Sequence, residues 1–148
     1  MQKSITKLVL SMLLVCVVAS AGSAATESLY TRLGGLTAIK AVVDQFVSNV
    51  GADNRINKFF SATVADPQRL ATFKTNLVNL ICQGAGGPCQ YTGKSMKDAH
   101  KGMGITDADF SALVADLVAA LNKFNVSAQN QKDLLAILGP MKSDIVGQ

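Results

Sequence analysis

The chain has 148 residues, of which 49% are hydrophobic, and a formal net charge of +4 at pH 7. This length leaves room for one domain with a sizeable core and for little else. Two of the lysines, Lys3 and Lys7, lie near the N-terminus, and residues 25–148 carry 12 basic and 10 acidic residues, a net charge of +2. A charge this small and scattered excludes the electrostatic footprint of a nucleic-acid-binding protein.

A secretory signal peptide is predicted over residues 1–24. A positively charged start precedes an apolar run over residues 8–19, and small residues fill positions 19–25. This order is typical of a signal peptide cleaved just after Ser23, Ala24 or Ala25. We therefore expect export, most simply to the bacterial periplasm, with residues 25–148 as the mature domain.

Two other uses of this N-terminal segment are disfavoured. A transmembrane anchor needs about 20 apolar residues, and the apolar run at residues 8–19 is shorter. A lipoprotein would be acylated at Cys16, but Val15 stands where that processing usually requires a small residue. No stable membrane span is expected after cleavage.

Cys82 and Cys89 are the two cysteines of the mature domain. Export implies an oxidising compartment, where this pair could form a disulfide that restrains a short loop. A catalytic thiol pair is less expected, because the chain has no Cys-x-x-Cys motif.

The first half of the mature domain shows the period of amphipathic helices. Apolar residues recur every three or four positions over residues 36–50, which predicts a helix. A short helical turn is expected over residues 53–60. Asp66-Pro67 has the signature of a helix start, and the helix that follows is expected to stop in the glycine-rich segment 84–88.

The second half continues the helical pattern. A loop over residues 89–93 and a short helix over 96–101 are expected, before Thr106 and Asp109 form a capping box for the next helix. Ser127 is expected to start the last helix, which Pro140 should kink. No alternating strand pattern is present, so the predicted fold class is all-α.

The order and spacing of several motifs closely resemble the group I truncated haemoglobins, over nearly the whole mature domain. The most specific part runs from Gly86 to Phe110. The motifs are Leu-Tyr-Thr-Arg-Leu-Gly-Gly at residues 29–35, Phe46, Asp53, Phe59-Phe60, Gly86-Gly87-Pro88-x-x-Tyr91-Thr92-Gly93 and Met96-x-x-x-His100-x-Gly102-x-Gly104-Ile105-Thr106.

The resemblance implies a truncated globin fold, a two-over-two helical sandwich around haem b. A haem needs an apolar slot, a nitrogen ligand and an open coordination position. His100, the one histidine of the chain, corresponds to the proximal iron ligand, and its other ring nitrogen should donate to a carbonyl or similar acceptor. Without a Cys-x-x-Cys-His motif the haem should be held non-covalently.

The resemblance also assigns the residues that line the haem. Tyr91 has two open interpretations, as a partner of a haem propionate or as a loop tyrosine packed under the domain. The implied cofactor-binding residues besides His100 are Phe46, Phe60, Phe73, Leu77, Tyr91, Met96, Ile105, Phe110 and Leu113.

The chain departs from the family on the distal side, where a gas ligand would bind. Most relatives have a hydrogen-bonding tyrosine where this chain has Val47, and an ungapped alignment puts Phe73 and Leu77 at the other distal positions, with Leu77 where a glutamine is common. The predicted distal pocket of Val47, Phe73 and Leu77 is therefore apolar. Lys74 could swing in as a substitute donor or ligand, although a solvated surface lysine is the simpler interpretation.

An apolar distal pocket has a kinetic consequence for oxygen. The outer atom of bound dioxygen carries partial negative charge, and a hydrogen bond to a charged group contributes about 1.5–3 kcal/mol. Its loss should speed oxygen release roughly 10- to 100-fold. High-affinity oxygen storage is thus disfavoured, and ligation by two histidines of one chain is excluded because only His100 is present.

The leading hypothesis is reversible binding of oxygen, CO or NO at a histidine-ligated haem iron, with an electron donor that keeps the iron reduced. The enzymatic alternative is a haem-dependent nitric oxide dioxygenase or a peroxidase-like detoxification enzyme. A haem-free helical binding domain is a third class, in which His100 is structural or forms a metal site with Cys82 and Cys89.

Overall fold

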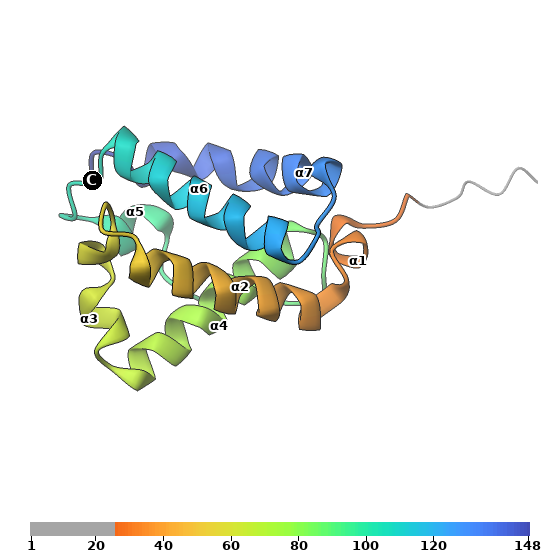
Figure 1. The fold of residues 1–148 in the computed structure, drawn as a ribbon, viewed down its shortest axis with the longest axis horizontal. Coiled ribbons are helices and arrows are strands. Elements are labelled where there is room, and N and C mark those ends of the chain that lie inside the picture. The colour runs from red at the N-terminus through yellow and green to blue at the C-terminus, as the bar shows by residue number, and fades with distance from the viewer. Residues whose placement is uncertain (1–25) are drawn as a thin grey trace, which may run out of the picture.

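The structure is a computed structural model that describes residues 26–148, all of whose regular elements are helical (Figure 1). The predicted signal peptide over residues 1–24 lies outside the described residues. The elements are α1 (Leu29–Arg32), α2 (Gly35–Ala52), the 3-10 helix η1 (Asn57–Phe59), α3 (Ser61–Val64), α4 (Pro67–Gly84), α5 (Met96–His100), α6 (Asp107–Lys123), α7 (Ala128–Leu138) and the 3-10 helix η2 (Gly139–Asp144).

Two predicted helix starts are confirmed by their caps. The Asp66 carboxylate accepts hydrogen bonds from the backbone N–H of Gln68 and Arg69, with Pro67 at the first position of α4. Thr106 and Asp109 form the predicted capping box at the start of α6. Caps of this kind typically contribute about 0.5–2 kcal/mol each, so they define where these helices begin.

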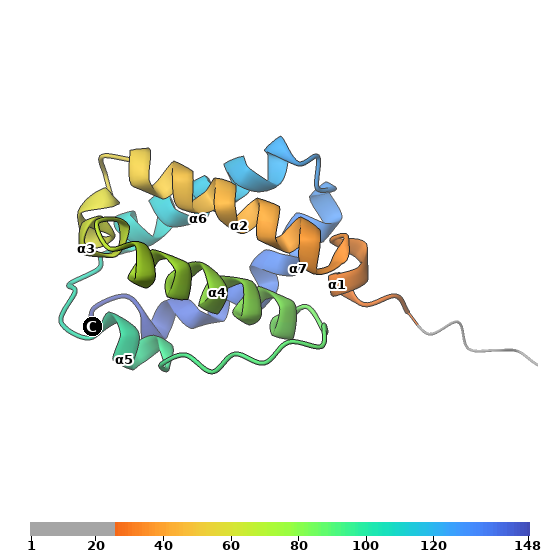
Figure 2. The ribbon, with the colours of Figure 1, turned by 90° about the horizontal axis from the view of Figure 1, so that it is seen from below.

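The long helices form two layers. Helix α2 packs against both α4 and α6, and two perpendicular views show α2 and α4 on one side with α6 and α7 on the other (Figures 1 and 2). The predicted two-over-two helical sandwich is confirmed.

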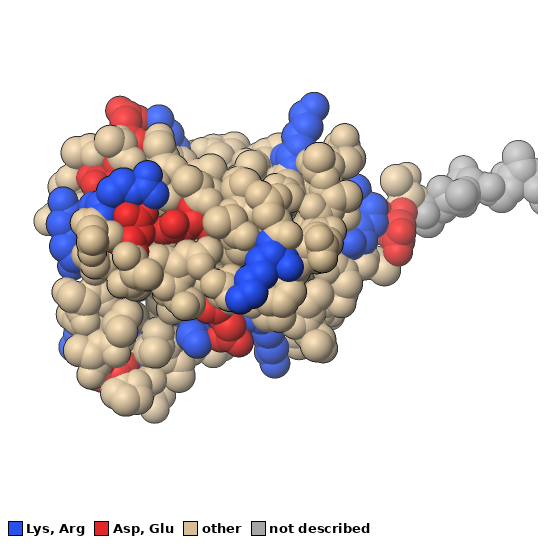
Figure 3. Space-filling view, in the orientation of Figure 1, with Lys and Arg blue, Asp and Glu red and all other residues tan. Residues whose placement is uncertain are grey.

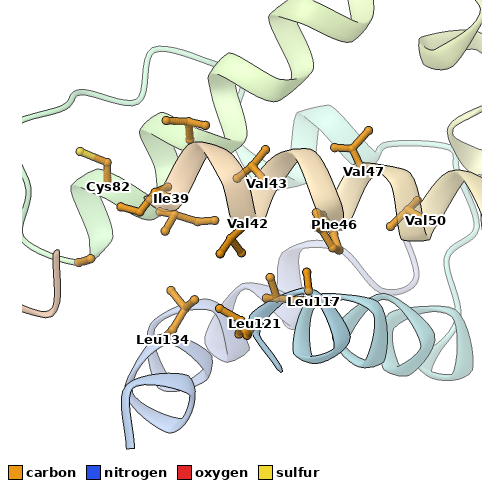
Figure 4. Packing of buried hydrophobic residues seen from close by; sticks show 14 of the residues in the cluster. Ile39, Val42, Val43, Phe46, Val47, Val50, Cys82, Leu117, Leu121 and Leu134 are labelled. Atoms are coloured by element: carbon orange, nitrogen blue, oxygen red, sulfur yellow. The ribbon is translucent and has the colours of Figure 1, made fainter. Parts of the chain in front are cut away.

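The core lies where α2 meets α6 and α7. Apolar residues of α2, among them Ile39, Val43 and Val50, are almost completely buried. Val42 and Phe46 of the same helix point toward Leu121 and Leu117 of α6, whereas Val43 points to the other side of α2 (Figure 4). Burying one such side chain contributes about 1.5–3 kcal/mol, so this contact holds the two layers together.

The C-terminal helix differs from the expected kinked helix. Helix α7 ends at Leu138, and the chain continues as η2, in which Pro140 lies. Proline has no N–H to donate and its ring clashes with the carbonyl four residues earlier, so an α-helix cannot pass through it unaltered. Helix α1 was not expected either, because its single turn, capped by Ser28, is too short to produce a hydrophobic period.

The surface carries charges of both signs. On the face shown in Figure 3, lysine and arginine side chains lie among aspartates and glutamates. Within residues 26–148, no helix is both long enough and apolar enough to cross a membrane.

Candidate functional site

A large apolar cavity lies between the two layers. Its volume is about 720 Å³, and its walls come from η1, α3, α4, α5, α6, the end of α7 and η2, with Phe46 contributed by α2. Cavities that hold cofactors commonly measure roughly 300–1,000 Å³. All ten residues predicted to bind the cofactor line this cavity: Phe46, Phe60, Phe73, Leu77, Tyr91, Met96, His100, Ile105, Phe110 and Leu113.

The imidazole of His100 has one ring nitrogen engaged and one available. Its Nδ1 lies 2.6 Å from the carbonyl oxygen of Met96. A carbonyl can only accept, so Nδ1 carries a proton, and in the neutral form of an imidazole held in this way the lone pair is on Nε2. No protein group of residues 26–148 bonds to Nε2, and the ring lines the cavity. This tautomer suits a nitrogen ligand for a metal.

Helix α5 holds this histidine at its C-terminal residue. The helix begins at a capped residue: Ser95 Oγ accepts from the backbone N–H of Asp98 at 3.1 Å and donates to its carboxylate at 2.7 Å. Gly102 has a φ of 78°, a conformation that glycine adopts at little cost. The chain can therefore turn sharply just after His100.

The wall formed by α4 is built from residues three or four positions apart. Phe73, Leu77 and Leu80 lie on this face, and the ring of Phe73 packs against Phe60 with centroids 5.7 Å apart. This spacing follows from the helical period. Most of the cavity wall formed by α4 is therefore apolar.

Val47 is the one predicted pocket residue that does not line the cavity. Val47 is buried in the core. In Figure 4 its side chain points away from one side of α2, whereas Phe46 points from the other side toward Leu117. Neighbouring residues of an α-helix point about 100° apart. Since Phe46 already faces the cavity, the short valine side chain cannot reach round the helix to it.

Lys74 is a surface lysine, which agrees with the simpler of its two interpretations. Its Nζ forms an ion pair with Asp44 at 2.8 Å, and it does not line the cavity. In this position Lys74 is paired with Asp44 and does not reach the cavity.

Several polar lining residues were missed by sequence reasoning. Asn76 of α4, Thr63, Lys94 and Asp109 all contribute to the cavity wall. Asn76 could have been found, because its position continues the spacing of Phe73 and Leu80. Lys94 lies in an irregular loop, where no periodic signal exists.

Tyr91 lines the cavity, and its hydroxyl group donates a hydrogen bond within the same loop. The hydroxyl donates to the carbonyl oxygen of Lys94 at 2.6 Å, and the Tyr91 backbone N–H donates to the side chain of Gln83. Burial raises the pKa of the Tyr91 phenol, so it stays protonated at neutral pH. A loop tyrosine packed under the domain therefore fits this arrangement better than a partner of a haem propionate. Lys94, an exposed cation, also lines the cavity.

Cys82 and Cys89 form a disulfide with their Cα atoms 5.7 Å apart. Cys82 is completely buried in α4, next to Ile81 of the cavity wall. The bond ties the end of α4 to the loop that leads to Tyr91. It leaves no free thiolate for a metal, and residues 26–148 contain no cluster of three His, Cys, Asp or Glu side chains able to hold a metal ion.

A family model described as "Bacterial-like globin" matches residues 28–146. The chain belongs to this globin family. It is 32% identical to the group 1 truncated haemoglobin of Tetrahymena pyriformis, over 82% of this chain and 97% of that protein. It is also 32% identical to the group 1 truncated haemoglobin GlbN of Mycolicibacterium paratuberculosis, over 80% of this chain and 83% of the relative.

Solved truncated haemoglobins share the fold of this globin. The Fe(III) form of the Tetrahymena pyriformis protein superposes with a TM-score of 0.75 at 29% identity, over 82% of this chain and all of that one. The 2/2 haemoglobin of Synechococcus gives a TM-score of 0.73 at 32% identity, with the same shares covered. The predicted relationship to the group I truncated haemoglobins is confirmed.

Haem b is the cofactor of this globin family. The residues of this chain fit it on two observations: the cavity is wide and mainly apolar, and the imidazole in its wall presents a nitrogen without a protein partner. An apolar plate with one metal ion to coordinate requires this combination.

Proposed function

We propose that this globin holds haem b with His100 Nε2 as the proximal iron ligand and reversibly binds oxygen, CO or NO on the opposite side. The observation that carries the proposal is the His100 imidazole, fixed by Met96 in the tautomer that presents an unprotonated nitrogen to the cavity. When bound, haem supplies a ferrous iron with an open coordination position for a diatomic gas.

The chain's own residues orient and enclose the cofactor. Phe60, Phe73 and Phe110 offer aromatic walls to the ring, and such burial is the main favourable term for an apolar ligand. Lys94 is an exposed cation at the cavity wall, suited to a carboxylate of the haem edge. The similarity to truncated haemoglobins supports a haem-binding role.

A binding role is preferred over a peroxidase-like or dioxygenase role. A peroxidase usually needs an acid or base above the reacting ligand. The α4 wall presents Phe73, Asn76, Leu77 and Leu80 there, and an asparagine amide does not transfer protons at neutral pH. The proposed function also requires an electron donor that keeps the iron reduced.

The test is gas binding by the purified protein. It is titrated with haemin, reduced and exposed to oxygen and CO, alongside a His100→Ala variant and a Lys101→Ala control on the exposed neighbour. The proposal expects stoichiometric haem uptake and reversible gas spectra for the wild type and Lys101→Ala, and loss of the five-coordinate spectrum for His100→Ala. An unaltered spectrum in His100→Ala would rule out His100 as the ligand.

We further propose that the protein is exported to the periplasm. The signal-like pattern of residues 1–24 supports this, and so does the Cys82–Cys89 disulfide, since such bonds persist in oxidising compartments. N-terminal sequencing of the protein from a periplasmic extract should begin at residue 24, 25 or 26. A product that still begins at Met1 in the cytoplasmic fraction would contradict export.

A further inference from the structure

Asn76 introduces a polar group into the otherwise apolar α4 wall. The helical period puts it on the same face as Phe73, Leu77 and Leu80, and all four line the cavity. Helix α4 and the histidine helix α5 lie apart in both views of the fold (Figures 1 and 2). If the haem lies between these two helices, which both line the cavity, a gas ligand bound on the side away from His100 would meet the α4 wall.

The amide of Asn76 is available for a ligand. Its neighbours Thr72 and Thr75 donate their hydroxyls to backbone carbonyls within α4, at 2.9 Å each. Within residues 26–148 the side chain of Asn76 makes no hydrogen bond, and it is half-buried. An amide nitrogen offers two N–H donors.

Other donors are less suited to this position. Lys74 is held by Asp44, and the Tyr91 hydroxyl donates to the Lys94 carbonyl. Thr63 lies on the short helix α3 rather than on the α4 wall. Asn79, on the same helix as Asn76, lines a separate groove with Lys40 and Asp44 and does not contact the cavity.

We propose that Asn76 is the distal hydrogen-bond donor of this globin and that it favours oxygen over CO. This rests on the proposed function. Bound dioxygen carries partial negative charge on its outer atom and gains from an N–H donor, whereas bound CO is far less polar and gains little. The donor makes up in part for the apolar residues around it, so oxygen should leave more slowly than from a pocket without Asn76.

The test compares Asn76→Leu and Asn76→Ala with Asn79→Leu as the matched control on the other face of α4. Oxygen and CO dissociation rates are measured by stopped flow on the ferrous haem-loaded proteins, and the CO stretching frequencies by infrared spectroscopy. Both Asn76 variants should release oxygen about 5- to 30-fold faster, with CO release changed less than about twofold and the CO stretch shifted upward. Asn79→Leu should match the wild type.

Two results would overturn the inference: one rejects only the donor role of Asn76, and the other rejects the proposed haem-binding function as well. If haem binds through His100 and both Asn76 variants keep the wild-type oxygen release rate and CO stretch, the donor role is wrong while the proposed function stands. If the wild type takes up no haem, or if His100→Ala binds haem unchanged, the proposed function itself fails. Two different substitutions at position 76, one of similar size and one shorter, ensure that misfolding of one does not hide the answer.

Discussion

The Nδ1 atom of His100 lies 2.6 Å from the carbonyl oxygen of Met96, one helical turn earlier in α5. The bond fixes the ring's tautomer and its rotation together, and so aims Nε2 into the cavity. The acceptor is a backbone atom of the same short helix. The position of the proposed iron ligand therefore depends on the integrity of α5.

The Ser95 cap should be required for tight haem retention. Ser95→Ala removes the acceptor of the Asp98 N–H and loosens the first turn of α5, at a cost of about 0.5–2 kcal/mol. Haem transfer to an excess of apomyoglobin should be faster than in the wild type. Ser127→Ala, which removes the equivalent cap from α7, should lower the unfolding midpoint similarly but change haem transfer much less. Equal transfer rates in the two variants would show that α5 has no special part in retention.

The Cys82–Cys89 disulfide should stabilise the protein through the loop it closes. For a loop this short, chain entropy predicts about 2–3 kcal/mol. Urea unfolding of a Cys82→Ala/Cys89→Ala double variant should show this loss. Reducing agent should lower the wild-type stability by a similar amount and leave the double variant unaltered, whereas a wild type insensitive to reduction would contradict the loop-closure argument.

Asp116 should make stability depend on pH. It is buried, and its Oδ2 makes no hydrogen bond within residues 26–148. Burial, together with the nearby Asp53 charge, raises the pKa of Asp116 above the ordinary value, against the opposing effect of Arg55. The folded state thus holds this proton more tightly than the unfolded state. Its contribution to stability is complete below the unfolded pKa, near 4, and is lost as pH rises through the higher folded pKa.

Urea unfolding between pH 4 and 8 measures this effect. Relative to wild type, Asp116→Asn should gain stability as the pH rises from 4 to 8, while Asp144→Asn, at an exposed site, should follow the wild type throughout. A constant difference between wild type and Asp116→Asn across the pH range would show that Asp116 does not titrate as argued.

Much of the fold was predictable because its signals are local and periodic. Asp66-Pro67 and the Thr106–Asp109 box set helix starts that the structure reproduces. The resemblance to the truncated haemoglobins, not a local period, assigned Phe73 and Leu77 to the pocket, and both line the cavity. The 3-10 ending at Pro140 was not foreseen, because proline excludes an α-helix without specifying what replaces it.

The errors at the site come from side-chain direction and length. Val47 was assigned to the pocket by its place after Phe46, but neighbouring helical residues face different ways and a valine is short. Asn76 was passed over although its spacing places it on the cavity face. Lys94 was also missed, because it lies on a loop whose path depends on the disulfide and on the Gln83 contact, which sequence spacing does not reveal.

Chemical rescue tests the ligand assignment most directly. In a His100→Gly variant, added imidazole can occupy the space of the missing ring and coordinate through its own nitrogen. We expect the ferrous variant without imidazole to lack the wild-type five-coordinate spectrum and the iron–nitrogen stretch in the resonance Raman spectrum, and to recover both as imidazole is titrated. A variant that shows the wild-type stretch before any imidazole is added would contradict His100 as the proximal ligand.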